Sequence, residues 1–321
     1  MPIFKNPNFD FLKWRWPALG LSLLIIVAGA VAAAMGGLAL GIDFSGGTSM
    51  IVQFDDPVTE DTVRDAIGGI ADENVVQRFG PDDANQVRIV LPQSGPEEGT
   101  SLEEGANAVR EALERSSVGR FEVIGQELVG PVIGEELQRR GVSAFGFAMA
   151  GILVYIGLRF RFSFAVGAVI AVVHDVLVTL AMLTFFGYEL SLNVVAAMLT
   201  ITGYSVNDSI VVFDRVRENL RRMRRDDFAT LVNTSINQTL SRTIITSGTT
   251  LFTVLALFVF GGEVLEGFAF TMIVGVISGT YSTIFIAAAA AIVISERRAT
   301  RRARATVGQA PATSKPKRRN K

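Results

Sequence analysis

Long apolar segments alternate with polar ones along most of this chain. Six segments are apolar over about 20 residues, the length that an α-helix needs to cross a membrane. They are Trp16–Leu40, Val142–Leu158, Phe162–Phe186, Leu190–Phe213, Ile244–Phe260 and Phe268–Ile294. The second and fifth are short, so we expect their helices to extend into the polar flanks. The pattern predicts a polytopic α-helical membrane protein with six transmembrane helices.

Basic residues collect on one side of these predicted helices. Lys and Arg in short loops are retained on the cytoplasmic side of a membrane. Basic residues lie before the first helix, between the second and the third, and throughout the C-terminal tail. Six arginines follow the fourth helix, from Arg215 to Arg225. The loops 187–189 and 261–267 contain none. We therefore expect six crossings of the cell (inner) membrane, with both the N-terminus (1–15) and the C-terminus in the cytoplasm.

The two ends of the chain need separate interpretation. The first apolar segment (16–40) is too long for a signal-peptide core, so we interpret it as a retained helix. The basic segment 296–321 predicts a disordered cytoplasmic tail. A solvated tail is favoured there over contact with anionic membrane lipids or ribosomal RNA, and no specific nucleic acid partner is expected.

One long polar segment interrupts the apolar pattern. Asp43 to Gln138 carries 20 acidic and six basic side chains, and the topology places it outside the cytoplasm. Its pattern predicts strand Ser49–Phe54, helix Thr59–Ile70, strands Asn74–Phe79 and Gln86–Leu91, helix Leu102–Arg115 and strand Arg120–Glu127. The order βαββαβ is typical of a ferredoxin-like fold. We expect an inserted α+β domain over 41–138, followed by a bundle of the remaining helices over 139–295.

A glycine pair marks the junction between the first helix and this domain. Residues Asp43 to Thr48 read DFSGGT, and Gly46 and Gly47 permit the positive φ angles of a sharp turn. A phosphate-binding loop would need a following Lys, which is absent. We interpret the motif as a structural junction.

Composition restricts the chemistry. Apolar residues make up 49% of the 321 positions, the mean hydropathy is +0.39, and there is no cysteine. Disulfides and cysteine-bound metals are therefore excluded, and the polar domain has neither His nor Cys to form a catalytic centre. We expect a protein that is not an enzyme and that uses no metal and no cofactor.

The fourth apolar segment carries Asp208, next to Asn207. An ionisable residue in a spanning helix costs roughly 2.5–3.5 kcal/mol on insertion scales, so its default interpretation is an ion or proton site that needs a partner. Arg242 lies one hairpin later, at the cytoplasmic start of the fifth helix. We expect its depth in the membrane to match that of Asp208. The alternative for Arg242 is an interfacial anchor whose charge reaches water.

His174 and Asp175 lie near the middle of the third segment. This lone histidine could take part in a secondary proton path, because its pKa is naturally near neutrality. An interhelical hydrogen-bonded contact is the favoured alternative. Asn207, with Thr200, Thr202 and Ser205, could line a hydrated path or bond between helices.

Several of these stretches together resemble the SecF proteins of the SecD/SecF family. They are Asp43–Thr48, Val129–Pro131, His174–Asp175, GYSVNDSIVVFDRVREN before position 220 and NQTLSRTIITSGTTL over 237–251. The match covers nearly the whole chain except the basic tail. The resemblance implies a member of the resistance-nodulation-division superfamily that works with SecD beside the SecYEG channel to draw preproteins outward, using the proton-motive force. It also implies YajC as a further partner.

The resemblance also assigns the site. Asp208 and Arg242 take the positions of the family's proton-relay pair, which a carboxylate from SecD completes. Two other functions stay open. The chain resembles half of a small-molecule or lipid exporter of the same superfamily, although its exported region of under about 100 residues is small for a substrate funnel. It is also compatible with a passive assembly factor, whose function would not depend on protons.

Overall fold

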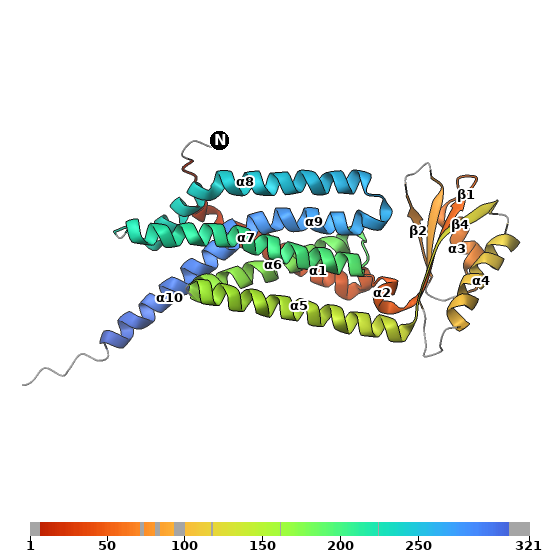
Figure 1. The fold of residues 1–321 in the computed structure, drawn as a ribbon, viewed down its shortest axis with the longest axis horizontal. Helices are drawn as coiled ribbons and strands as arrows, with labels where there is room; N and C mark the ends of the chain where they lie inside the picture. Colours follow the sequence, from red (N-terminus) through yellow and green to blue (C-terminus); the bar gives the residue numbers. More distant parts are fainter. Residues whose placement is uncertain are drawn as a thin grey trace, which may run out of the picture.

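The computed structural model describes residues 7–70, 74–80, 84–92, 100–116, 118–160, 162–223 and 225–307. A bundle of long helices forms one end of an elongated molecule, and a small α+β domain forms the other (Figure 1). Within the described residues, six helical segments are long and apolar enough to cross a membrane. This confirms the polytopic α-helical fold with an inserted domain.

The first crossing is α1 (Arg15–Ala32), continued by the π-helical turn η2 (Ala33–Gly37). The next four are α5 (Pro131–Arg159), α6 (Phe162–Phe186), α7 (Leu192–Arg222) and α8 (Phe228–Phe260). The last is α9 (Glu263–Ser282), the π-helical turn η3 (Thr283–Ala287) and α10 (Ala288–Val307). As expected, the second and fifth crossings extend beyond their apolar cores.

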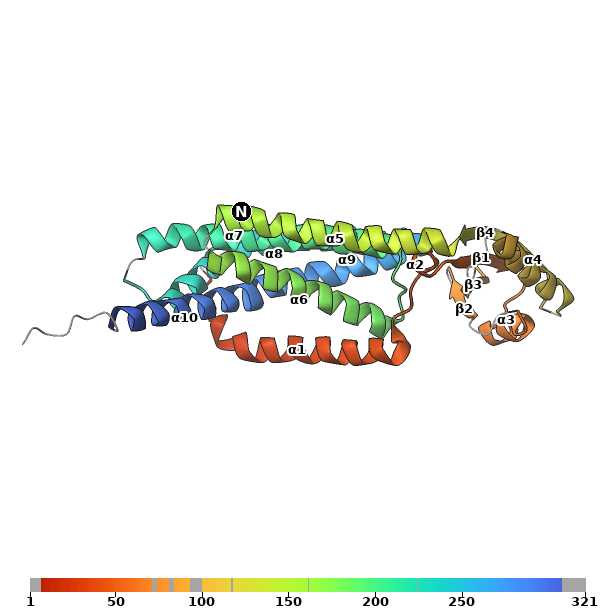
Figure 2. The same cartoon turned by 90° about the horizontal axis from the view of Figure 1, so that it is seen from below.

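Helices α6, α7 and α9 form the buried centre of the bundle, with α1, α5 and α8 around them. In the second view α1 runs along α6 on one side of the bundle (Figure 2). Small residues permit such close approach, since a Cβ on Gly29 of α1 would lie only 2.2 Å from the Cβ of Ala181 on α6. The helices are therefore held together by close packing of small side chains, which is the usual means of helix association in the hydrocarbon core of a membrane.

The α+β domain consists of β1 (Gly47–Phe54), α3 (Glu60–Ile67), β2 (Val75–Phe79), β3 (Gln86–Pro92), α4 (Thr100–Arg115) and β4 (Phe121–Val129). The sheet order is β2-β3-β1-β4, and every neighbouring pair is antiparallel. Alternate strand residues pack against the two helices in a separate apolar core, including Val52, Val63 and Leu113. Both the predicted βαββαβ order and the ferredoxin-like arrangement are confirmed.

Two predicted boundaries differ from the structure. Helix α5 begins at Pro131, so the last residues of the predicted domain, up to Gln138, already belong to a transmembrane helix. Proline suits the first turn of a helix because its missing N–H has no intrahelical acceptor there. At the other end, α10 continues to Val307 instead of giving way to disorder at 296, because its Ala- and Arg-rich sequence favours a helix. Residues 308–321 of the predicted tail lie outside the described residues.

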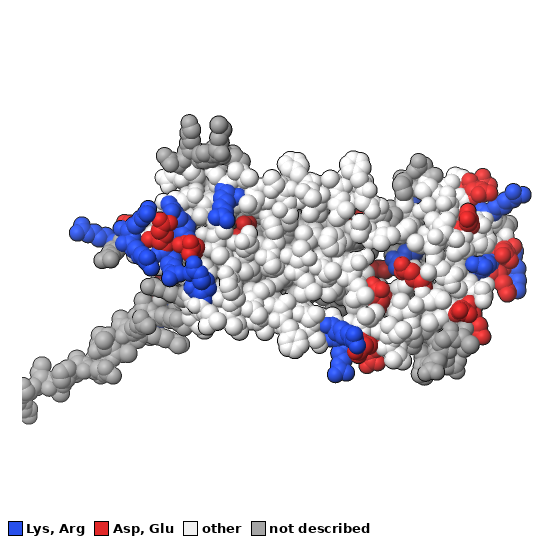
Figure 3. Space-filling model, viewed as in Figure 1, with Lys and Arg blue, Asp and Glu red and all other residues white. Residues whose placement is uncertain are grey.

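Charged side chains separate to the two ends of the molecule. On the face shown in Figure 3, an uncharged band covers most of the bundle between a predominantly basic end and the charged α+β domain. The basic end contains the hairpin between α7 and α8, where Asp227 caps α8. Hydrogen bonds from Thr230 lower the pKa of Asp227 below its ordinary value, which keeps this cap charged. The uncharged band is the surface expected to contact lipid tails.

Candidate functional site

Asp208 lies on the buried face of α7, where only 3% of its surface is exposed. The hydroxyl of Ser247 on α8 donates to its Oδ2 at 3.3 Å, and the hydroxyl of Thr280 on α9 donates to Ser247 at 2.8 Å. A chain of three polar side chains thus joins three helices across the bundle. Among the described residues, the carboxylate has one neutral donor from a side chain, which is little support for a buried charge.

Arg242 lies on the exposed side of α8, five residues before Ser247. At 1.5 Å per residue it is about 7.5 Å nearer the basic end than the serine that contacts Asp208. Its charge attracts the Asp208 carboxylate, but among the residues that the structure describes no ion pair joins the two. The structure therefore brings Arg242 near Asp208 without direct pairing, and the expected match in depth is offset by more than one helical turn.

Asp175 is the most extensively hydrogen-bonded carboxylate of the described bundle. It is fully buried on α6 and contacts side chains from three helices. Ser205 of α7 donates to Oδ2 at 2.5 Å, Ser282 of α9 donates to Oδ2 at 2.7 Å, and Ser278 of α9 donates to Oδ1 at 2.7 Å. Nδ1 of His174 lies 3.0 Å from Oδ1. The predicted His174 and Asp175 contact is therefore part of a larger interhelical cluster.

His174 has only one of its ring nitrogens paired in this cluster. Its Nε2 is buried with no hydrogen-bond partner among the described groups, and its ring stacks on Tyr281 at a centroid distance of 6.0 Å. The Tyr281 hydroxyl donates to the carbonyl of Ala18 and accepts from Ser22, both on α1. A neutral ring with its proton on Nδ1 leaves only an unpaired acceptor at Nε2, which costs less than an unpaired charged donor.

Sequence reasoning missed the serines that contact the two aspartates. Ser278 and Ser282 are four residues apart on α9, a spacing that places both on one face of a helix. Ser247 of α8 lies within the SRTIITS stretch, in which the sequence pattern predicts a role only for Arg242. Helical spacing could have suggested the pair on α9, but neither aspartate could be assigned to them without the packing of the helices. Ser205, by contrast, was among the predicted polar residues and contacts Asp175 directly.

Asn207 points away from this interior and is exposed, although it adjoins Asp208. Thr200 and Gly203 are exposed on the same stripe of α7. On α8, Arg242 and Thr249 are also exposed. This surface places an amide and a guanidinium on the outside of the hydrophobic bundle.

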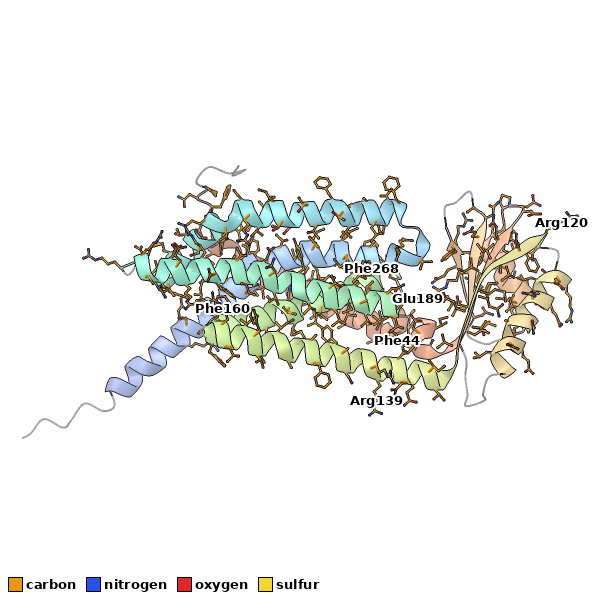
Figure 4. The ribbon with its side chains drawn as sticks, in the orientation of Figure 1. Phe44, Arg120, Arg139, Phe160, Glu189 and Phe268 are labelled. Carbon is orange, nitrogen blue, oxygen red and sulfur yellow. The ribbon has the colours of Figure 1, made fainter. Side chains whose placement is uncertain are left out.

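The glycine junction connects the domain directly to α7. Gly46 and Gly47 have φ angles of 69° and 136°, which favour glycine, and they follow the single helical turn α2 (Ile42–Ser45). Oδ2 of Asp43 accepts a hydrogen bond at 2.9 Å from the backbone N–H of Leu192, the first residue of α7. The side chain drawn at Glu189 in Figure 4 lies in the same region, between the bundle and the domain. The junction thus supports the helix that carries Asp208.

Six apolar helices around buried carboxylates, with a ferredoxin-like domain inserted after the first helix, define a multi-pass membrane protein with ionisable groups in its bundle. The described residues contain no group of three or more His, Asp or Glu side chains arranged to hold a metal ion. The chain belongs to the SecD/SecF family. Residues 109–297 match the model of the protein export membrane protein SecD/SecF, C-terminal, and residues 32–58 match the SecD/SecF GG motif.

Similar proteins agree with this family. The chain is 41% identical over 291 residues to the protein translocase subunit SecF of Escherichia coli O157:H7, covering 90% of this chain and 89% of that protein. It is 41% identical over 303 residues to the SecF subunit of Calditerrivibrio nitroreducens, covering 93% and 98%. These matches confirm the resemblance to SecF and indicate a role in transport rather than catalysis.

The fold also matches a solved structure of SecDF, a translocon-associated membrane protein from Thermus thermophilus. The TM-score is 0.79 at 36% identity, over 92% of this chain. A structure of SecDF in a super-membrane-facing form matches with a TM-score of 0.69 at 37% identity. This chain spans only 40% and 41% of the length of those two chains.

Proposed function

We propose that this chain works with SecD beside the SecYEG channel and uses the proton-motive force to complete the export of preproteins. Asp208 is the group that binds and releases the proton, and Arg242 is its counter-charge. The observation that carries the proposal is the environment of Asp208, which is a buried carboxylate inside the membrane and which, among the described side chains, accepts a hydrogen bond from Ser247. Such a group is stable as a neutral acid and needs a cation when ionised.

Arg242 can supply that cation after a short movement. It lies about 7.5 Å along α8 from the serine that contacts Asp208, a distance that a change of helix packing together with its long side chain can bridge. The bundle then has two arrangements, one with a neutral Asp208 and one with an ionised Asp208 paired to Arg242. A charge that crosses the membrane potential supplies about 2.3 kcal/mol per 100 mV, enough to shift the ratio of two such states by about fiftyfold.

The exposed polar surface of α7 and α8 supports SecD as the partner. Hydrocarbon offers no hydrogen-bond partner to the amide of Asn207 or the guanidinium of Arg242, so this surface needs protein or water against it. A carboxylate from SecD would satisfy Arg242 when Asp208 is protonated. The name SecDF of the similar structure supports the same pairing. YajC remains a proposed partner on the strength of the family alone, and membrane lipids are proposed partners on the strength of the uncharged band around the bundle.

The charge distribution supports an orientation with the basic end in the cytoplasm and the α+β domain outside it. Both termini are then cytoplasmic. The domain faces the side on which exported preproteins emerge, so its movement could act on them directly. Protonation from the outside and release to the inside would complete the cycle, with the proton gradient in place of any cofactor.

The test is Asp208→Asn, which keeps the size of the side chain and removes the titratable proton. Completion of preprotein translocation is measured with and without a proton gradient, in vesicles that contain SecD and SecYEG. We expect gradient-dependent stimulation to fall to the level without a gradient. Asp214→Asn is the matched control, since Asp214 is an exposed carboxylate on the same helix whose partner is Arg159 at 3.3 Å.

Full stimulation in Asp208→Asn would exclude the proton-relay role. A deletion strain that accumulates a small molecule instead of preproteins would favour the exporter alternative. Indifference of all function to the gradient would favour a passive assembly factor.

A further inference from the structure

The Asp175 cluster provides a complete set of partners for an ionised carboxylate. A carboxylate has two oxygens with about four acceptor positions in total, and here each oxygen contacts two potential donors. Three of these donors are neutral serine hydroxyls, and the fourth is the ring nitrogen of His174. A buried carboxylate with this many donors has its hydrogen-bonding capacity satisfied without a cation beside it. Asp175 and Asp208 therefore have opposite environments within one bundle.

The two aspartates are connected through α7. Ser205, which binds Asp175, precedes Asp208 by three residues, which is about 4.5 Å along the axis of α7 and nearly one turn. Any shift of α7 that breaks the bond to Ser205 also moves Asp208 relative to Ser247 of α8. The position of the proposed proton site thus depends on a bond made one turn earlier.

Helix α9 connects the same two sites a second time. Ser278 and Ser282 bind Asp175 from one face of α9, and Thr280 between them binds Ser247 from another. The π-helical turn η3 begins directly after Ser282. Such turns interrupt the regular hydrogen bonding of a helix and are frequent at functional sites. Helix α9 therefore holds the two clusters at a fixed distance from each other.

We propose that Asp175 is a positioning residue, whose carboxylate binds serines of α7 and α9 and so holds Asp208 in contact with Ser247, the contact in which Asp208 exchanges its proton. This inference rests on the proposed proton-relay role of Asp208. It assigns Asp175 no proton transfer of its own, in contrast to a secondary proton path through His174 and Asp175. The Asp175 anchor stays in place while Asp208 gains and loses its proton.

Other ionisable groups near Asp175 are few. Among the described residues they are His174 on α6 itself, Tyr281 of α9 behind the His174 ring, and Tyr204 and Asp208, which lie near Ser205 on α7. From α1, Ser22 donates to the Tyr281 hydroxyl and the carbonyl of Ala18 accepts from it. Among the described residues, His174 is the only basic group within ion-pair distance of Asp175. The serine hydroxyls are thus the partners whose removal tests the anchor most directly.

The experiment measures proton occupancy of Asp208 separately from transport. Dicyclohexylcarbodiimide couples to protonated carboxyl groups in membranes, so labelling of Asp208 at different pH values, followed by mass spectrometry, gives the pH at which half of it is protonated. The complex with SecD is used throughout, and Asp208→Asn supplies the background. The variants are Ser278→Ala, Ser282→Ala and Asp175→Asn.

We expect each serine variant to move the half-labelling pH of Asp208 upward by about one unit. The reason is that the bond from Ser247 to ionised Asp208 weakens, and losing a hydrogen bond to a charged group changes an equilibrium about tenfold. The Ser247 contact weakens when α7 and α9 are no longer anchored, and the ionised Asp208 loses support. Ser282→Thr restores a hydroxyl and should return the wild-type profile. Thr271→Val is the matched control on α9, because in the part of the chain that the structure describes the Thr271 hydroxyl bonds to the carbonyl of Gly267 on its own helix and to no side chain.

An unchanged labelling profile in both serine variants would overturn the positioning role, and so would an equal shift in Thr271→Val. If Asp175→Asn fails to accumulate, the single serine variants still decide the question. Failure of the proposed function is distinguishable, since it would appear as gradient-stimulated transport in Asp208→Asn whatever the Asp175 variants do.

Discussion

Arg88 of β3 and Glu189 of the loop before α7 form an ion pair between the α+β domain and the membrane bundle. Nη1 of Arg88 lies 3.1 Å from Oε2 of Glu189, and their side chains are only 22% and 11% exposed. Nε of Arg88 also donates to the hydroxyl of Ser49 on β1, which fixes the guanidinium in place. Together with the bond from Leu192 to Asp43, the pair attaches the domain to the first turn of the helix that carries Asp208. A movement of α7 would therefore act on the domain through these two contacts.

Breaking this pair should uncouple the domain from the bundle. We expect Arg88→Glu to reduce gradient-stimulated translocation at least fivefold, since it places two carboxylates together in a half-buried site. The exchange Arg88→Glu with Glu189→Arg should recover a large part of the activity. Arg115→Glu is the control, because Arg115 pairs with Glu111 on the exposed side of α4 within the domain. If the exchange is no better than Arg88→Glu alone, the pair is not the coupling element.

The sequence predicted Asp208 as a site residue because a charged residue within an apolar segment is visible in the hydrophobic pattern alone. It could not predict the partners of Asp175, since these come from positions 205, 278 and 282 and meet only through the packing of α6, α7 and α9. The depth of Arg242 was misjudged for a related reason. Fourteen residues separate Asp208 from the end of α7, and as many separate Arg242 from the start of α8, so level helices would align the two. The bond to Ser247 instead shows an axial offset, which depends on helix crossing and not on spacing.

Close packing of α7 against α9 depends on two glycines in the last crossing. A Cβ on Gly275 would lie 2.1 Å from Cδ1 of Ile201, and one on Gly279 would lie 3.1 Å from Cβ of Ser205. We expect Gly275→Val to force the helices apart and to lower the stability by about 1–3 kcal/mol, the usual cost of overpacking. The measurement is the thermal aggregation temperature in detergent. Gly248→Ala is the control, because its Cβ would meet nothing within 4 Å, and an equal loss in that variant would argue against helix separation.

The proposed orientation is testable with single cysteines, because the chain has none of its own. Asp61 in the α+β domain and Val264 beside the loop before α9 are exposed at one end, whereas Arg222 and Asp226 are exposed at the other. A maleimide that cannot cross the membrane should label cysteines at 61 and 264 in intact cells, and cysteines at 222 and 226 only after lysis. The opposite pattern would place the basic end outside and would contradict the proposed direction of proton flow.

Arg242 should matter through its charge and through the partner that covers it. Arg242→Ala removes the counter-charge of Asp208, so we expect gradient-dependent translocation to fall to the level without a gradient. Arg242→Lys keeps a positive charge on a flexible side chain and should retain part of the stimulation, although lysine cannot form a bidentate contact with a carboxylate. Arg222→Ala is the control, since Arg222 is an exposed arginine that pairs with Glu218 at 2.8 Å.

A cysteine at position 242 tests separately whether SecD covers this side of α8. Its reaction with a membrane-permeant maleimide should slow at least fivefold when SecD is present, because the proposed partner covers this exposed side of α8. Equal reaction rates with and without SecD would show that another surface binds the partner.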